Sequence, residues 1–167
     1  MNFVRFGERG IPMIILKVTN IKAFMNRLLI QPVFDDWEFQ GAEIAALTQY
    51  SVAGTINPRY LTDEEKKTRT NMALRFGEVR LILASIVRAG HTPTTMKLVL
   101  ACPPALLEGH VSIGAQSYLM TIHFQDGILK LTGGISMRTF SMDRTDAQFW
   151  DDHFPKVLSK LQIEYEI

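Results

Sequence analysis

The chain has 167 residues, of which 47% are hydrophobic and 21% charged, a composition typical of one soluble globular domain. A formal net charge of +1 gives no overall field that attracts nucleic acid or an acidic surface, so such a partner would require a local patch. The only cysteine, Cys102, excludes an internal disulfide, and no apolar run approaches the ~20 residues that cross a bilayer. We therefore expect a cytoplasmic protein without membrane contact.

The first twelve residues differ from the rest of the chain. They contain two glycines, a proline and three charged residues, and no hydrophobic segment follows that would make them a secretion signal. We expect residues 1–12 to be a loosely attached leader and residues 13–167 to be a single α+β domain. No internal repeat or low-complexity segment divides that domain.

The domain is predicted to begin with a strand and a helix. The run Met13–Val18 is β-branched and apolar, which predicts a strand. Asn20 follows as a helix cap, and an apolar stripe over residues 21–29 predicts a short amphipathic helix. Pro32 ends this helix because a residue before proline disfavours helical geometry.

The next segment changes to the period of strands. Trp37 and Phe39 alternate with polar residues, Gly41 indicates a bulge or turn, and Ile44–Leu47 and Tyr50–Ile56 predict two further strands. The mixed charges of residues 62–70 then predict a solvated loop or short helix.

The stretch Met72–Cys102 predicts a helix that leads directly into a buried strand. Apolar residues at helical spacing define the predicted buried face: Val79, Ile82, Leu83, Ile86 and Val87. Gly90 is suited to the helix end, and Pro93 prevents the helix from resuming. Thr95–Leu100 is the extended run that follows.

A three-stranded meander is expected in the second half of the chain. Residues 118–124 alternate, and Asp126-Gly127 is the strongest hairpin signal in the sequence. Gly133-Gly134 predicts a second turn, which would lead into a third strand at Ile135–Met142.

The C-terminal segment is predicted to be helical. Thr145 and Gln148 match a capping box, and Pro155 predicts a kink or a division into two short helices. The segment's outer side is expected to be acidic, through Asp146, Asp151 and Asp152.

A motif search finds no pattern that predicts a catalytic site, a metal site or a cofactor. The chain has no phosphate loop, no H-E-x-x-H and no paired cysteines. The four histidines lie on separate predicted elements without ligand spacing: His91, His110, His123 and His153. Two pairings stay open for a small enzyme, Cys102 with His91 or His110, and His123 with Asp126 near the loop Leu107–Gln116.

One charge pattern predicts a binding surface. The first helix exposes Lys22 and Arg27, and the second carries Arg80 and Arg88 on one stripe. If the two helices lie side by side, these four residues form a basic strip, which is sufficient for contacts with nucleic-acid phosphates. The alternative is that the four charges serve solubility, with their aliphatic stems lying over the core.

The order of predicted elements resembles one domain of the DNA sliding clamps, in which a β-α-β-β-β unit occurs twice. The resemblance covers roughly Met13 to Met142 and rests on element order. It implies a curved antiparallel sheet with two short helices on one face, and helices that carry the residues that track duplex DNA. A clamp ring needs several such domains, and the acidic segment after Asp143 has no counterpart in a clamp domain.

Three stretches are similar in sequence to an uncharacterised bacterial family described only as a domain of unknown function. They are Ile21–Leu29, Thr92–Val99, and Thr132–Asp143 with Trp150 beyond it. The similarity spans most of the chain from Met13 and implies no activity.

Three hypotheses follow for the function. The first is a non-enzymatic binding module that contacts nucleic acid weakly and without sequence specificity through the basic helix faces. The second is a protein-interaction or self-assembly module, and a homo-oligomer is compatible with it. It would use the edge of the final meander or the aromatic C-terminal segment. The third is a small enzyme whose site is not visible in the sequence.

Overall fold

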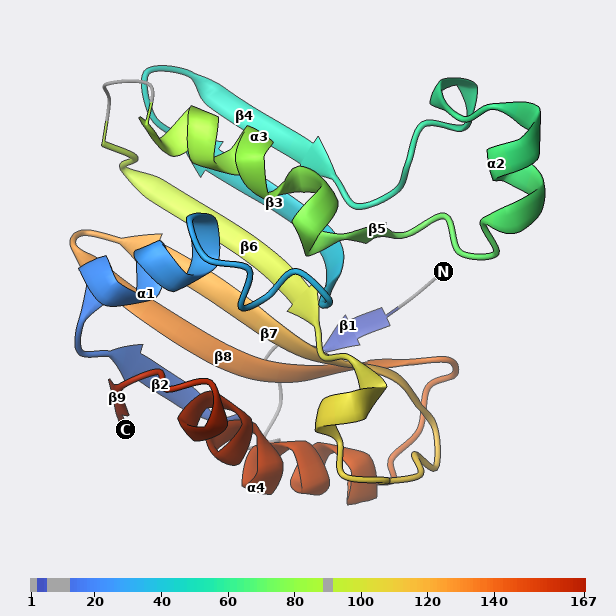
Figure 1. Ribbon diagram of the computed structural model, residues 1–167. Coiled ribbons are helices and arrows are strands. Elements are labelled where there is room, and N and C mark those ends of the chain that lie inside the picture. The colour runs from blue at the N-terminus through green and yellow to red at the C-terminus, as the bar shows by residue number, and fades with distance from the viewer. Residues whose placement is uncertain (1–2, 6–12, 89–91) are drawn as a thin grey trace.

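The computed structural model describes residues 3–5, 13–88 and 92–167, which form one open antiparallel sheet with helices packed on it (Figure 1). The strands are β1 (Phe3–Arg5), β2 (Ile15–Val18), β3 (Glu38–Ala45), β4 (Gln49–Ala53), β5 (Leu74–Arg75), β6 (Thr95–Ala101), β7 (Ala115–Gln125), β8 (Ile128–Met137) and β9 (Tyr165–Glu166). The helices are α1 (Ile21–Leu29), α2 (Asp63–Thr68), α3 (Phe76–Arg88) and α4 (Thr145–Lys160), with short 3-10 turns η1 (Pro58–Tyr60) and η2 (Pro104–Leu106).

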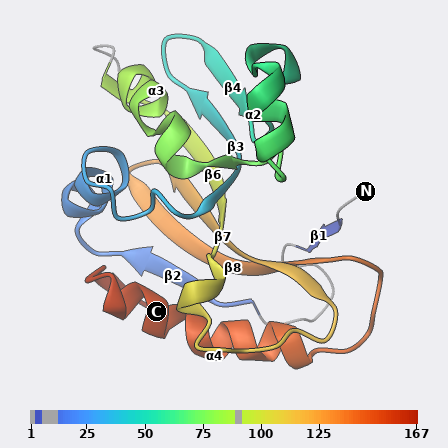
Figure 2. The ribbon, with the colours of Figure 1, turned by 45° about the vertical axis from the view of Figure 1, so that its right-hand side comes forward.

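The strand order is β4-β3-β6-β7-β8-β2-β9, with β1 added to β8 and β5 added to β3. Helices α1, α3 and α4 lie on the same face, where their apolar sides and the inward residues of the strands form one core (Figures 1 and 2). Along β6, for example, Met96, Leu98 and Leu100 are buried while Lys97 between them is exposed. The predicted α+β class, with two short helices on one face and a C-terminal helical segment, is confirmed.

Several local predictions are also confirmed. The Asn20 side chain accepts a hydrogen bond from the backbone N–H of Ala23 and caps α1. Gly41, with φ +146°, lies at a register shift between β3 and β6, which is the predicted bulge. The β7–β8 hairpin turns at Asp126 and Gly127, both with positive φ, as a tight turn of this type requires.

The predicted meander is wrong. β8 runs without interruption through Gly133, so the glycine pair makes no turn and there is no third strand beyond it. A Cβ at position 133 would lie 3.0 Å from Ile14 Cγ2 and 3.2 Å from Phe154 Cδ1. Gly133 therefore allows α4 to lie close against the sheet, a tertiary reason that a local turn signal does not reveal. β3 likewise continues through Ile44, so no separate strand begins there.

The start of α4 also differs from the prediction. Thr145 is the first helical residue rather than the cap, and its backbone N–H and hydroxyl both donate to Asp143 Oδ1, at 2.8 and 2.6 Å. α4 continues across Pro155, so it is not divided into two short helices. Asp146, expected on the acidic outer side, is buried.

Among the described residues, no helix has the length and apolar character needed to span a bilayer.

The buried face of α3 is rotated relative to the prediction. Val79 and Leu83 are buried as expected, but Ala84 is buried too and Ile82 is 55% exposed.

Gly90, the predicted helix end, lies outside the described residues. In the expected leader, Phe3–Arg5 pair with β8, and the rest of that segment also lies outside the described residues.

Candidate functional site

Arg80, one of the four predicted phosphate contacts, is engaged inside the protein. Its Nε lies 2.8 Å from Asp35 Oδ1, and its Nη1 donates to the Ile30 carbonyl at 3.1 Å. The guanidinium therefore satisfies a carbonyl at the C-terminal end of α1 and neutralises a carboxylate on the following loop. Because Ala84, on the same stripe, is buried, this stripe faces α1 rather than the outer surface.

The other three predicted cations lie in separate surroundings. Helices α1 and α3 do lie side by side, and Lys22 and Arg88 are exposed. Arg27 is half-buried and lines a cleft of about 240 Å³ together with Gln162 and Glu164. The continuous basic strip is therefore broken at Arg80, whereas contact of nucleic acid with Lys22, Arg27 and Arg88 stays a prediction.

A different row of charges crosses the sheet on the face opposite the helices. The paired registers of seven strands place one residue from each strand side by side along a straight line. In order from β4 to β9 these residues are Ser51, Glu43, Lys97, His123, Lys130, Lys17 and Glu166. All of them are exposed except His123, which is half-buried. We call the four central residues of this line the cationic row: Lys97, His123, Lys130 and Lys17.

Neighbouring members of the cationic row are close because adjacent strands lie about 4.8 Å apart. Glu166 Oε1 lies 3.5 Å from Lys17 Nζ at one end of the row, and Glu43 stands directly opposite Lys97 at the other. Between these ends, Lys130 has no carboxylate within ion-pair distance in the described part of the chain. Like charges placed opposite each other destabilise a sheet, so a bound anion would relieve this arrangement.

The surface beside the cationic row is formed by small and β-branched side chains. The next line across the strands contains Gly41, Val99, Thr121, Thr132 and Ile15. The Thr121 hydroxyl is buried without a hydrogen-bond partner among the described residues. A shallow depression of about 350 Å³ lies over β3, β4 and β6 and includes Lys97. Neither line contains a Phe, Tyr or Trp side chain, and the imidazole of His123 is their one ring, so this surface offers contacts to a charged backbone rather than a stacking platform for successive bases.

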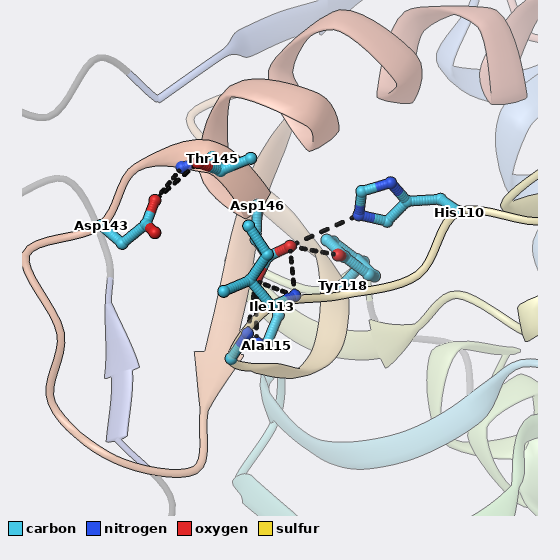
Figure 3. A network of polar contacts seen from close by, with 8 residues as sticks. His110, Ile113, Ala115, Tyr118, Asp143, Thr145 and Asp146 are labelled. Atoms are coloured by element: carbon cyan, nitrogen blue, oxygen red, sulfur yellow. Dashed lines mark hydrogen bonds and ion pairs between the residues drawn. The ribbon is translucent and has the colours of Figure 1, made fainter.

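A buried carboxylate organises the opposite side of the molecule. Asp146, in the first turn of α4, accepts hydrogen bonds from the backbone N–H groups of residues 113–115 at 2.9–3.1 Å and from the Tyr118 hydroxyl at 3.1 Å (Figure 3). His110 Nε2 lies 3.4 Å away. Burial alone would raise the pKa of Asp146, but the backbone hydrogen bonds and the His110 contact outweigh it and lower the pKa to about 2. Burial and the adjacent carboxylate raise the pKa of Tyr118.

The rings around Asp146 make this network part of the framework. His110 stacks on Phe149 with ring centroids 3.6 Å apart, and His153 stacks on the same ring at 5.0 Å. His153 Nε2 lies 2.7 Å from the Leu106 carbonyl. These contacts fix the loop before β7 to α4 and occupy the Asp146 oxygens. The arrangement is suited to holding a loop in place.

The predicted enzymatic pairs receive little support from the geometry. Burial raises the pKa of Cys102 to about 12, so its thiol is protonated and unreactive at neutral pH. His110 is engaged by Asp146, and His91 lies outside the described residues. His123 belongs to the cationic row, and within the described ranges it makes no hydrogen bond to Asp126 in the adjacent turn. The described residues also contain no group of three side chains suited to a metal ion.

A cleft beside Cys102 has a mixed polar and apolar lining. It has a volume of about 680 Å³ and is bordered by β5, the residues before it and the ends of β3 and β6. Arg69 and Glu78 in its wall form a two-pronged ion pair at 2.8 and 3.0 Å. This pairing lowers the pKa of Glu78, so the two charges satisfy each other.

A comparison with family models gives a match over most of the chain. A model described as a family of unknown function, DUF5721, matches residues 27–166. The chain belongs to this family. The predicted similarity to a family of unknown function is therefore confirmed. No curated protein and no solved structure matches the chain, and the comparisons do not support the resemblance to DNA sliding clamps.

The cationic row was not among the predicted sites, although part of its register is encoded in the sequence. The Asp126-Gly127 hairpin fixes His123 opposite Lys130, and this pair could have been derived from the turn alone. The placement of β6 and β2 on the two sides of that hairpin depends on long-range pairing, and only this placement brings Lys97 and Lys17 into the line. No sequence motif indicated the Asp146 network, because most of its hydrogen-bond donors are backbone N–H groups of a loop.

Proposed function

We propose that this protein is a non-catalytic binding module that holds the sugar-phosphate backbone of nucleic acid on its helix-free sheet face. The observation that carries the proposal is the cationic row, in which Lys130 stands between His123 and Lys17 without a carboxylate partner in the described chain. A phosphate chain can follow such a row, because its charges repeat along one direction and need no side-chain pocket.

The composition of this face favours the backbone of nucleic acid over its bases. Threonine and valine beside the row provide neither stacking platforms nor bidentate donors for base edges. The proposed binding is therefore sequence-independent. With a net charge of +1, long-range attraction is small, so the affinity should be modest and should fall steeply with salt.

Fluorescence anisotropy with a labelled duplex and a labelled single strand of mixed sequence tests the proposal. We expect binding at about 50 mM salt, and a slope of log Kd against log salt of about 1 for each lysine that neutralises a phosphate. Replacing Lys97 and Lys130 with glutamate together should abolish binding. Each lost phosphate contact should cost about tenfold at this salt concentration.

The helix faces supply a matched control. The double variant Lys22→Glu with Arg88→Glu makes the same change of charge on exposed residues of α1 and α3. The proposal predicts that this variant binds nearly as tightly as the parent. If it loses binding while the sheet-face variant keeps it, the basic helix faces are the interface and the sheet-face assignment is wrong. If both variants keep the binding of the parent, neither surface is the interface with nucleic acid.

A further inference from the structure

The two edges of the sheet differ in how well they are protected against pairing with another strand. The edge strand β9 has only two residues, and glutamates lie at 164 and 166. At the other edge, β4 has five residues, Gln49 to Ala53, with neither charge nor proline, and no strand of the described chain pairs with its outer side. Charges, prolines and short length are the usual protections of an edge, and β4 has none of them.

The backbone of β4 is turned to accept a partner. The Ala45 carbonyl accepts a hydrogen bond from Thr94 on the β6 side at 2.8 Å, and Ala45 stands opposite Gln49. Because backbone groups alternate in direction along an antiparallel ladder, the N–H and C=O groups of Gln49, Ser51 and Ala53 point to the open side.

The helix above this edge exposes apolar side chains toward the same side. Arg80 points to α1, and Ile82 lies about 200° farther around the helix, so Ile82 points away from α1 toward β4. Figures 1 and 2 show α3 over this end of the sheet, with α1 on its other side. Ile82 is 55% exposed, and Leu47 in the β3–β4 turn is 73% exposed.

We infer that β4 pairs antiparallel with β4 of a second copy of this chain, centred on Ser51, and forms a two-fold dimer with a continuous sheet. In this register Tyr50 faces Val52 of the other copy and Gln49 faces Ala53, so no like charges meet at the seam. An aromatic side chain opposite a β-branched one is a favourable cross-strand pair. The self-complementary, uncharged sequence is the reason to assign a second copy as the occupant rather than a different protein.

The dimer also aligns the two charged lines. Ser51 is the first residue of the line that continues through Glu43 and Lys97, so pairing at Ser51 joins the two lines end to end on one face. The inferred dimer does not rest on the proposed function. Its test uses the protein alone, so the dimer can fail while nucleic-acid binding holds, and the reverse.

Light scattering coupled to size-exclusion chromatography tests the inference at several protein concentrations. We expect a species of twice the 19.0 kDa chain mass that dissociates on dilution. Ser51→Lys places two lysines opposite each other at the seam, and Ile82→Glu puts a charge on the exposed apolar side of α3 beside it, so each should weaken the dimer at least tenfold. Gln125→Lys, an exposed change at the hairpin, should leave the dimer intact.

Cysteine cross-linking tests the register directly. Facing Ser51 Cα atoms would lie about 5.5 Å apart, within the range that a disulfide spans, so Ser51→Cys should form a covalent dimer on mild oxidation. Gln49→Cys should not, because its two copies lie four positions out of register, and buried Cys102 should not react. A monomer at high concentration, a dimer that survives both Ser51→Lys and Ile82→Glu, or equal cross-linking at 49 and 51 would overturn the inference. A complex only with another protein would also overturn it.

Discussion

The two faces of the sheet handle charge in opposite ways. On the helix-covered face, Arg80 and Asp146 are surrounded by partners from distant parts of the chain, and their charges stabilise loops and helix ends. On the open face, Lys130 stands between Lys17 and His123, has no carboxylate partner in the described part of the chain, and faces solvent. The difference indicates that a cation on a helix is not by itself a binding residue. What matters is whether the fold already supplies its counter-ion.

The largest expected effect on the covered face comes from Asp146→Ala. The substitution leaves three backbone N–H groups, of which that of Ala115 is buried, and the buried Tyr118 hydroxyl without their acceptor, so we expect a loss of about 3 kcal/mol in the free energy of unfolding. Chemical denaturation measures it. Asp152→Ala, nearly two turns along the same helix and exposed, is the control and should change stability by less than about 0.5 kcal/mol. Equal effects in the two variants would contradict the assigned role of Asp146.

Acid should weaken the same network. The pKa of Asp146 is about 2 in the folded protein against 3.8 for an unperturbed aspartate, so the folded state binds this proton less readily than the unfolded state. Its contribution of about 2 kcal/mol is therefore complete above pH 4 and is lost as the pH falls toward 2. Unfolding curves from pH 5 to 2 should show this loss in the parent and a shallower dependence in Asp146→Asn. Parallel curves would contradict the lowered pKa.

Arg80→Ala should have a smaller effect and no consequence for binding. It leaves Asp35 and the Ile30 carbonyl without their cationic partner, and we expect a loss of about 1.5 kcal/mol in the free energy of unfolding. Arg88→Ala, on the same helix but exposed, should cost less than about 0.5 kcal/mol. An Arg80→Ala protein that folds normally yet loses affinity for nucleic acid would show that Arg80 takes part in binding and would contradict this assignment.

Much of the fold was accessible from sequence because its signals are local. Asn20 as a cap, Gly41 at the bulge and the Asp126-Gly127 turn each depend on the backbone preferences of one or two residues. The failures depend on distant neighbours. Gly133 resembles a turn residue until α4 is placed against it, and Ile82 looks like a core residue until α1 is found on the far side of α3.

The candidate site was less predictable than the fold for the same reason. The four helix cations were identified from spacing alone, and spacing cannot show that Asp35 and the Ile30 carbonyl receive Arg80. The cationic row requires the order of strands β2, β6, β7 and β8, which follows from the global packing of the sheet. Asp146 was placed on an acidic outer side because its backbone donors leave no mark in the sequence.

The most direct test of the contrast between the two faces is Lys130→Glu, with stability and affinity measured on the same preparation. Because Lys130 lies opposite Lys17 and His123, the change should leave the free energy of unfolding unchanged or raise it by a few tenths, about 0.3 kcal/mol. The Kd for a labelled duplex should rise at least about tenfold at 50 mM salt. An unchanged Kd, or a loss of binding that merely follows a loss of stability, would contradict the account.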